Sequence, residues 1–281
     1  MPIIGAHVSA AGGLYKAFEN AKAIGARAMQ IFGASPRQWV GKFPEHGVIE
    51  QFKKEYKASN IACVFLHAPY LANLASPNPF VVKQSIASLV LHLKIAEAIG
   101  AQGLIFHPGS GKGMENKKAL KQVSDNMKKT LKAAPGKSEL IIENTAGGGN
   151  KVGATLQDLK DMLNGVKSPR VKICFDTAHA YEAGLIEEYT QKNIKNLFDA
   201  FDKTIGLDKL SAIHANDSKT PMNSHNDRHE NIGKGCIGIS GFKNLAKEKR
   251  LHSIPFILEV PGFSKEGPDK KNIDILSSCF S

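Results

Sequence analysis

The chain has 281 residues, of which 42% are hydrophobic, and these numbers fit one well-buried domain. Its 37 Lys and Arg exceed its 26 Asp and Glu, which gives a formal net charge of +11. This excess is typical either of a protein with a polyanionic partner, nucleic acid first, or of a solvated lysine-rich surface. We expect no secretory signal, no apolar run near the ~18 residues that span a bilayer, and hence no membrane partner.

Eight short apolar runs alternate with longer amphipathic segments, as expected for parallel strands that are buried on both faces. The runs cover residues 3–6, 28–32, 62–66, 104–106, 140–142, 171–175, 210–213 and 256–258. Among the helices between them, the clearest has Asn78 as N-cap, Pro79 at its first position and Gly100 at its end. The alternation predicts a (β/α)8 TIM barrel, a single domain over residues 1–281. An open doubly wound sheet is the alternative, but it would more often show a Gly-x-Gly-x-x-Gly turn, which is absent.

The four cysteines are far apart in the sequence and form no Cys-x-x-Cys pair. They are Cys63, Cys174, Cys236 and Cys279, and two of them fall in the apolar runs. We therefore expect buried, reduced thiols in a cytoplasmic protein rather than a disulfide framework.

A His, Asp or Glu directly follows seven of the eight runs. These residues are His7, His67, His107, Glu143, Asp176, His214 and Glu259. Only the second run, which ends near Phe32, lacks one. In a (β/α)8 barrel all these positions lie on one rim, where the active sites of this fold are built. One such residue is most often a turn or cap residue, but seven at one mouth without a cation would bury unpaired charge. The pattern therefore favours a metal centre.

Two further groups extend this set. His179 lies one helical turn beyond Asp176, and Asp227-Arg228-His229 forms an Asp-x-His pair whose side chains point the same way in extended backbone. Leaving His7 aside, five His, two Asp and two Glu are candidate ligands. At three or four ligands per ion, with one bridging carboxylate, nine ligands fit about three ions. Nitrogen and oxygen donors without thiolates favour zinc, with Mn²⁺ or Fe²⁺ as candidate replacements at one site.

The chain also resembles the endonuclease IV family of apurinic/apyrimidinic endonucleases, trinuclear zinc enzymes of base excision repair on a TIM barrel. The resemblance runs from Gly5-Ala6-His7-Val8-Ser9 through Leu258-Glu259. The matching blocks are Pro36-Arg37-Gln38-Trp39, His67-Ala68-Pro69-Tyr70, Phe106-His107-Pro108-Gly109-Ser110, Ile142-Glu143-Asn144-Thr145-Ala146-Gly147, Asp176-Thr177-Ala178-His179, His214-Ala215-Asn216-Asp217-Ser218-Lys219, Asp227-Arg228-His229-Glu230 and Ile232-Gly233-Lys234-Gly235. Two departures, Ala178 for the common Cys and Val260 for the common Thr, concern no ligand.

The resemblance implies a role for each of these positions. His67 and His107 would bind one zinc, which Glu143 would bridge to a second zinc completed by Asp176, His214 and Glu259. His179, Asp227 and His229 would hold the third. Glu143 and Glu259 would be the catalytic carboxylates, with proton transfer as an added role for Glu143. Arg37, Tyr70, Leu71 and Arg228 would contact DNA, the first three at the space left by a flipped-out nucleotide. His7 is expected to support the ligands without binding metal.

The implied activity is hydrolysis of the phosphodiester 5′ to an abasic site in double-stranded DNA, leaving a 3′-hydroxyl and a 5′-deoxyribose phosphate. The enzyme would be a DNA-repair hydrolase, a monomer with no obligate protein partner. It would be cytoplasmic, and associated with the nucleoid in a bacterium.

Two other functions compete with this one. A sugar isomerase or epimerase could use Glu143, Asp176, His214 and Glu259, but it would not need the other five ligands or the basic charge. A DNA-binding protein with structural zinc would be expected to offer a closed, Cys-rich site. The remaining histidines, His46, His92, His225 and His252, are expected at the surface.

Overall fold

The computed structural model describes residues 2–35, 38–39 and 41–281. Eight parallel strands close into a barrel in the order β1-β10-β7-β6-β5-β4-β3-β2, which confirms the predicted TIM barrel. In chain order they are β1 (Ile4–His7), β2 (Ala28–Phe32), β3 (Cys63–His67), β4 (Gly103–Phe106), β5 (Glu139–Glu143), β6 (Val171–Asp176), β7 (Leu210–His214) and β10 (Phe256–Leu258). The ends of every strand lie close to the predicted bounds.

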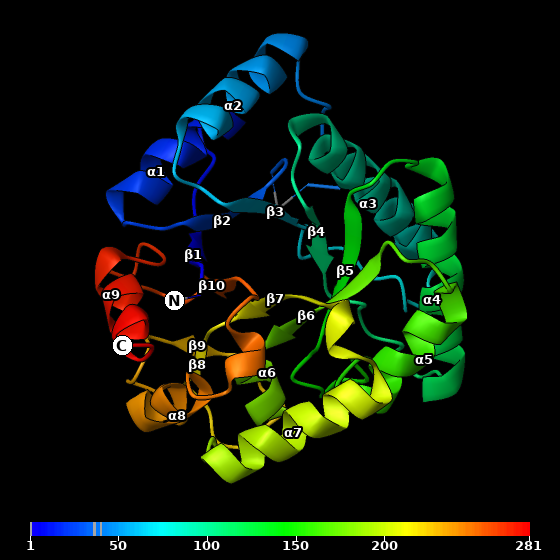
Figure 1. The fold of residues 1–281 in the computed structure, drawn as a ribbon. Helices are drawn as coiled ribbons and strands as arrows, with labels where there is room; N and C mark the ends of the chain where they lie inside the picture. Colours follow the sequence, from blue (N-terminus) through cyan, green and yellow to red (C-terminus); the bar gives the residue numbers. More distant parts are fainter. Residues whose placement is uncertain (1, 36–37, 40) are drawn as a thin grey trace.

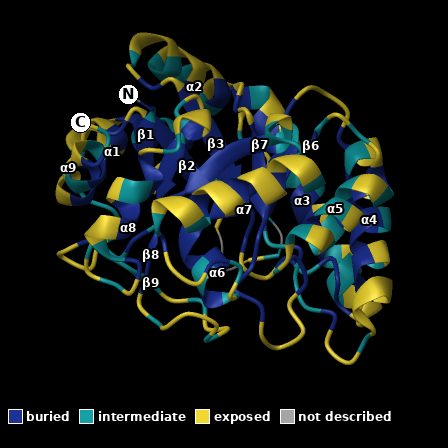
Figure 2. Ribbon diagram, turned by 60° about the horizontal axis from the view of Figure 1, so that its bottom comes forward, coloured by how far each residue is buried: buried dark blue, intermediate teal, exposed yellow. Residues whose placement is uncertain are grey.

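Helices surround the strands in Figure 1. They are α1 (Ala17–Ala23), α2 (His46–Ala58), α3 (Pro79–Ile99), α4 (Asn116–Ala133), α5 (Leu156–Val166), α6 (Thr177–Glu182), α7 (Gln191–Thr204), α8 (Gly238–Leu245) and α9 (Lys270–Ser278). Figure 2 shows their outer faces exposed and the strands buried. The main hydrophobic core lies between these two layers, because each helix turns its apolar stripe toward the barrel.

Helix α3 shows how local sequence sets an element. Asn78 caps its start by accepting a hydrogen bond from the backbone N–H of Phe80, and Gly100 ends it in the left-handed region at φ 75°. The helix has the length and mean hydropathy (1.2) of a membrane-crossing segment, so the expectation that no apolar run approaches that length was wrong. It packs as a barrel helix, however, with His92 and Leu93 on its buried face. The prediction of a surface position for His92 was therefore also wrong.

The inside of the barrel is filled by a second, smaller cluster with one or two side chains from most strands. It consists of Ala28, Cys63, Phe65, Ile105, Ile141, Cys174, Ala212 and Ile257. Side chains alternate between the two faces of a strand, so the residue two positions later points into the barrel again. Those later positions include His67, His107, Glu143, Asp176, His214 and Glu259. The apolar layer is thus the floor on which the polar rim residues stand.

The four cysteines are free, as predicted. Burial raises the pKa of Cys63 to about 11 and that of Cys174 to about 12, so both thiols stay protonated inside the barrel. Cys236 is exposed and Cys279 is buried near the C-terminus.

A feature that the sequence did not predict follows β7. Strands β8 (Asp217–Ser218) and β9 (His229–Glu230) form a short antiparallel pair, and the loop between them carries Asp227. Asp217 anchors this region because its carboxylate accepts hydrogen bonds from the backbone N–H groups of Gly233, Gly235 and Ile237. The pair returns the chain to the barrel mouth, so that residues 227–229 reach the rim.

Candidate metal centre

The nine predicted ligands come together at the carboxyl end of the barrel. Together with Glu182 they fall into four overlapping groups, and within each group one ligand atom per residue lies no more than 4.8 Å from the others. The groups are His67, His107 and Glu143; Glu143, Asp176, His214 and Glu259; Asp176, His179 and His229; and His179, Glu182 and Asp227. The first two match the predicted sets residue for residue.

Glu143, at the end of β5, joins the first two groups and is completely buried. Its Oε2 lies 3.1 Å from His67 Nε2 and 2.9 Å from His107 Nε2. Its Oε1 lies 2.9 Å from His214 Nδ1, which is also 3.2 Å from Glu259 Oε2. One carboxylate therefore faces ligand atoms from both sets, which is the geometry expected of a bridging residue.

The third predicted set is less compact. Asp227 Oδ1 lies 3.2 Å from His179 Nε2 and 3.9 Å from His229 Nε2. Among the described residues, none of the four groups contains His179, Asp227 and His229 together. His179 is grouped once with Asp176 and His229, and once with Glu182 and Asp227. Both Nε2 atoms are buried without a hydrogen-bond partner among the described residues. Buried polar atoms are normally paired, so orphaned imidazole nitrogens that face a carboxylate fit a cation site.

Three imidazoles are anchored through one of their two ring nitrogens. His67 Nδ1 donates to the Ala68 carbonyl at 2.8 Å, and His179 Nδ1 donates to the Asn144 carbonyl at 2.9 Å. His214 Nε2 donates to Gln30 Oε1 at 2.8 Å. A carbonyl oxygen only accepts, so each anchored nitrogen carries a proton, and the second ring nitrogen is turned toward the site. Metal-binding histidines are typically held in this way.

Glu143 keeps its charge despite burial. Burial would raise the pKa of Glu143, but His107 and His214 hold it well below its usual range. For His179, burial would lower the pKa, but Asp176, Asp227 and Glu143 raise it well above its usual value. Protons on imidazoles thus balance the negative charge in the chain alone. Divalent cations would replace those protons, because metal binding requires neutral imidazoles and ionised carboxylates.

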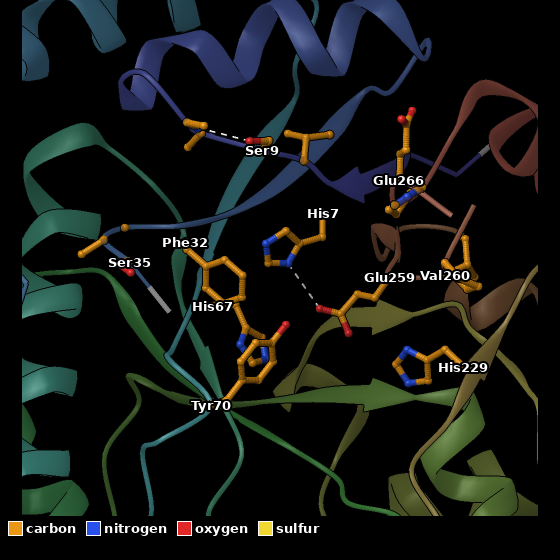
Figure 3. A pocket seen from close by; sticks show the side chains of 18 of the residues that line it. His7, Ser9, Phe32, Ser35, His67, Tyr70, His229, Glu259, Val260 and Glu266 are labelled. Atoms are coloured by element: carbon orange, nitrogen blue, oxygen red, sulfur yellow. Dashed lines mark hydrogen bonds and ion pairs between the residues drawn. The ribbon is translucent and has the colours of Figure 1, made fainter. Parts of the chain in front are cut away.

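An open cavity of about 1070 Å³ leads to this rim. Figure 3 shows Phe32, His67 and Tyr70 at one side of it, with His7, Glu259 and His229 around the others. Tyr70 is 75% exposed and Leu71 is 38% exposed, both in the loop after β3. Arg228 also lines the cavity, its guanidinium bonded to the Asp227 carbonyl. Arg37, the fourth predicted DNA contact, lies outside the described residues.

The sequence analysis missed two buried side chains at the site. Gln30, on β2, bonds Glu259 Oε1 at 2.5 Å and His7 Nδ1 at 2.9 Å through its amide nitrogen, in addition to His214. Gln30 lies two residues before Phe32 and is the one polar residue of an otherwise apolar strand. It is therefore the polar side chain that β2 contributes to the site, although no His, Asp or Glu follows this strand. Glu182 lies three residues after His179 on α6, a spacing that puts both on one helix face. His7 belongs to none of the four groups, which fits the supporting role expected of it.

Comparison with known proteins places this geometry in a family. Residues 18–279 match the family model described as "Xylose isomerase-like TIM barrel". The chain is 36% identical to a probable endonuclease 4 of Aquifex aeolicus (strain VF5), over 100% of this chain and 98% of that protein. It is similar to the crystal structure of endonuclease IV from Thermus thermophilus, with a TM-score of 0.88, 33% identity, and coverage of 99% of this chain and 98% of that one.

Likeness to a sugar epimerase is confined to the fold. A D-tagatose 3-epimerase-like protein superimposes with a TM-score of 0.72 but is only 19% identical, with 99% of this chain and 97% of that one covered. Two observations decide between an endonuclease and a sugar epimerase. The chain is more than 30% identical to endonuclease IV proteins over its full length, and its rim carries the His, Asp and Glu residues described above. This chain belongs to the endonuclease IV family and is an enzyme of the hydrolase class.

Proposed function

We propose that this enzyme hydrolyses the phosphodiester 5′ to abasic sites in double-stranded DNA, leaving a 3′-hydroxyl and a 5′-deoxyribose phosphate. The observation that carries the proposal is the buried Glu143, which lies within 3.1 Å of imidazole nitrogens from both predicted ligand sets. A carboxylate in this position can join two metal ions. Such paired ions stabilise the attacking and leaving oxygens of an in-line displacement at phosphorus. The similar proteins are named endonucleases, which supports a phosphodiester of a nucleic acid as the bond that is cleaved.

We assign three zinc ions to the rim, with Mn²⁺ or Fe²⁺ as candidates at one site. His67, His107 and Glu143 would hold the first; Glu143, Asp176, His214 and Glu259 the second; and His179, Asp227 and His229 the third. When bound, such ions lower the pKa of water and neutralise charge on a phosphodiester.

The chain's own residues keep this arrangement rigid before substrate binds. Asn144 Oδ1 accepts a hydrogen bond from the Asp176 backbone at 2.6 Å, and Asn216 Nδ2 donates to Asp176 Oδ2 at 2.7 Å. Asn216 Oδ1 in turn accepts from the Glu259 backbone at 2.8 Å. We assign Glu143 and Glu259 as the catalytic carboxylates, and Glu143 can also accept a proton during hydrolysis. Preorganised charges of this kind need no rearrangement in the transition state.

Damage recognition would use the exposed residues at the edge of the cavity. Tyr70 and Leu71 are apolar side chains of the kind that wedge into a kinked duplex, and Tyr70 packs edge-on against Phe32 at 5.5 Å between centroids. Arg228 would contact phosphate, and Arg37 would enter the stack beside the damaged site. A nucleotide without a base leaves the stack at the lowest cost, which favours abasic sites.

We further propose that residues 1–281 act as one endonuclease domain, as a monomer without an obligate protein partner. Relatives of similar length support the single domain, because the alignments cover nearly all of both chains. The expected location is the cytoplasm, with the nucleoid as the site of action in a bacterium.

The test is an assay on two duplex oligonucleotides that differ only by one abasic site. We expect cleavage of the abasic duplex alone, with a 3′ end that a DNA polymerase extends directly. Cleavage of both duplexes at equal rates would refute the assigned substrate. A 3′ end carrying an unsaturated sugar fragment would refute hydrolysis 5′ to the site.

A further inference from the structure

Glu182, the last residue of α6, has a carboxylate whose two oxygens differ sharply in their surroundings. The residue is completely buried. Oε1 accepts hydrogen bonds from Ser218 Oγ at 2.8 Å, Thr220 Oγ1 at 3.1 Å and the Arg228 backbone N–H at 3.2 Å. Oε2 has no hydrogen-bond partner among the described residues. One oxygen thus anchors the loop after β8, and the other is left free.

The carboxylate lies beside a candidate cation site. One ligand atom from each of Glu182, His179 and Asp227 lies within 4.8 Å of the other two. His179 Nε2 is likewise unpaired, and lies 3.2 Å from Asp227 Oδ1 without the alignment of a hydrogen bond. Three buried or half-buried donor groups therefore approach one another with two of their atoms unsatisfied.

Burying an ionised carboxylate oxygen without a donor is costly. In the described part of the chain, no lysine or arginine forms an ion pair with Glu182. Lys151, the lysine that reaches this group of residues, pairs instead with Asp227 Oδ2 at 3.7 Å. A divalent cation next to Oε2 would offset the cost and would satisfy His179 Nε2 as well.

We propose that Glu182 supplies an additional carboxylate oxygen to the cation held by His179 and Asp227. This rests on the proposed function, which places an ion at that site, and goes beyond it by adding a ligand and a consequence. With two carboxylates beside its imidazoles, the site is richer in oxygen than the set His67, His107 and Glu143. Oxygen donors favour Mn²⁺ relative to zinc, so Glu182 shifts the preference of this one site toward Mn²⁺.

The substitution Glu182→Gln tests the role of Glu182 as a metal ligand separately from its role in anchoring the loop after β8. The amide keeps a carbonyl oxygen for Ser218, Thr220 and the Arg228 N–H, but its NH2 group cannot bind a cation. Ser218→Ala does the reverse, since it removes one donor to Oε1 and leaves the carboxylate charged. Glu187→Gln, at an exposed position on the segment after α6, controls for the change of net charge.

The experiment is equilibrium dialysis of the full-length wild type and these variants against Mn²⁺ alone and against Zn²⁺ alone, with bound metal counted per chain. We expect E182Q to weaken the affected Mn²⁺ site by about tenfold or more and the Zn²⁺ site by less. S218A and E187Q should bind both ions as the wild type does.

Unchanged Mn²⁺ binding by E182Q would overturn the role of Glu182 as a ligand but not the metal centre. An equal loss of Mn²⁺ binding in S218A would also overturn it, because loop anchoring would then explain both results. If E182Q unfolds, Glu182→Asp, which keeps the charge and the acceptor oxygens but draws them back by one methylene, is compared with S218A in the same way. A wild type that binds no ion would overturn the proposed metal centre as a whole.

Discussion

At the scale of single residues, the site depends on side chains that hold other side chains. Gln30 contacts Glu259, His7 and His214 at once from the floor of the rim. Because Glu259 can only accept, the amide nitrogen must face it, and the amide oxygen must face His214. Gln30 therefore fixes the orientation of the His214 ring, with Nε2 donating to Gln30 and Nδ1 turned toward Glu143.

Replacing Gln30 by Leu should leave His214 and Glu259 without their shared partner. We expect metal affinity and abasic-site cleavage to fall by about 10- to 100-fold, as for other residues that orient metal ligands. Metal content after dialysis is the direct measurement. The substitution Gln30→Glu should restore the acceptor for His214 but not the donor to Glu259, so full rescue by this variant would contradict the assigned orientation of the amide.

Replacing Glu143 by Gln keeps the shape of the side chain and removes its charge. Strand cleavage should be almost eliminated while binding to abasic duplex stays largely intact, because the DNA contacts lie elsewhere on the rim. Single-turnover cleavage and a binding titration on the same duplex measure both. A wild-type cleavage rate in this variant would show that Glu143 does not join the two ligand sets in the active enzyme.

At the scale of elements, the loop after β3 carries the proposed recognition residues away from the proposed metal ligands. It begins at the proposed ligand His67 and continues to Tyr70 and Leu71, whose side chains are exposed. The strand end is held by the barrel, and the loop is free to meet the substrate. Recognition can therefore be altered without disturbing the ligands.

Changing both Tyr70 and Leu71 to Ala should reduce discrimination for abasic over intact duplex by ~1–3 kcal/mol, if each acts as a stacking platform. The salt dependence of binding should barely change, because neither residue is charged. Lys265→Ala, at the edge of the same cavity, should do the reverse and lower the salt slope by about one. Salt titrations on both duplexes make the comparison, and unchanged discrimination would reduce Tyr70 and Leu71 to loop packing.

At the scale of the whole molecule, the barrel brings the proposed ligands together at one rim. They come from most of its strands and from the segments after β6 and β7, so metal binding should raise the stability of the whole fold. A ligand that binds only the folded state stabilises it by mass action. Cations at the proposed site would displace the imidazole protons that balance the buried carboxylates, which would link occupancy of the site to the charge balance of the fold.

Prolonged chelation should therefore abolish cleavage and lower the thermal unfolding temperature, and zinc should restore both. By the ligand count above, purified protein should contain about three zinc-like ions per chain. Depleting magnesium alone should have no effect, because the donors are rich in nitrogen and magnesium prefers oxygen. Fully active protein with one ion or none, measured by elemental analysis, would contradict the trinuclear assignment.

The sequence alone determined the eight strands, the ends of α3 and the residues at the strand ends, because these depend on short-range patterns. Asn78, Pro79 and Gly100 act within one or two turns of α3, and buried strands appear as apolar runs. The strand ends then follow from the fold, since parallel strands of a closed barrel finish on one rim.

Only the tertiary structure decided which side chains meet. Gln30 joins the rim because closure of the barrel places β2 next to β1 and across from His214, a relation that no local pattern encodes. Glu182 lies near Asp227 because the β8–β9 pair folds the loop between its two strands back onto α6. Burial of His92 likewise depends on the rotation of α3 against the barrel. In each case the deciding contact joins residues far apart in the chain, and its energy depends on packing that forms only when the barrel closes.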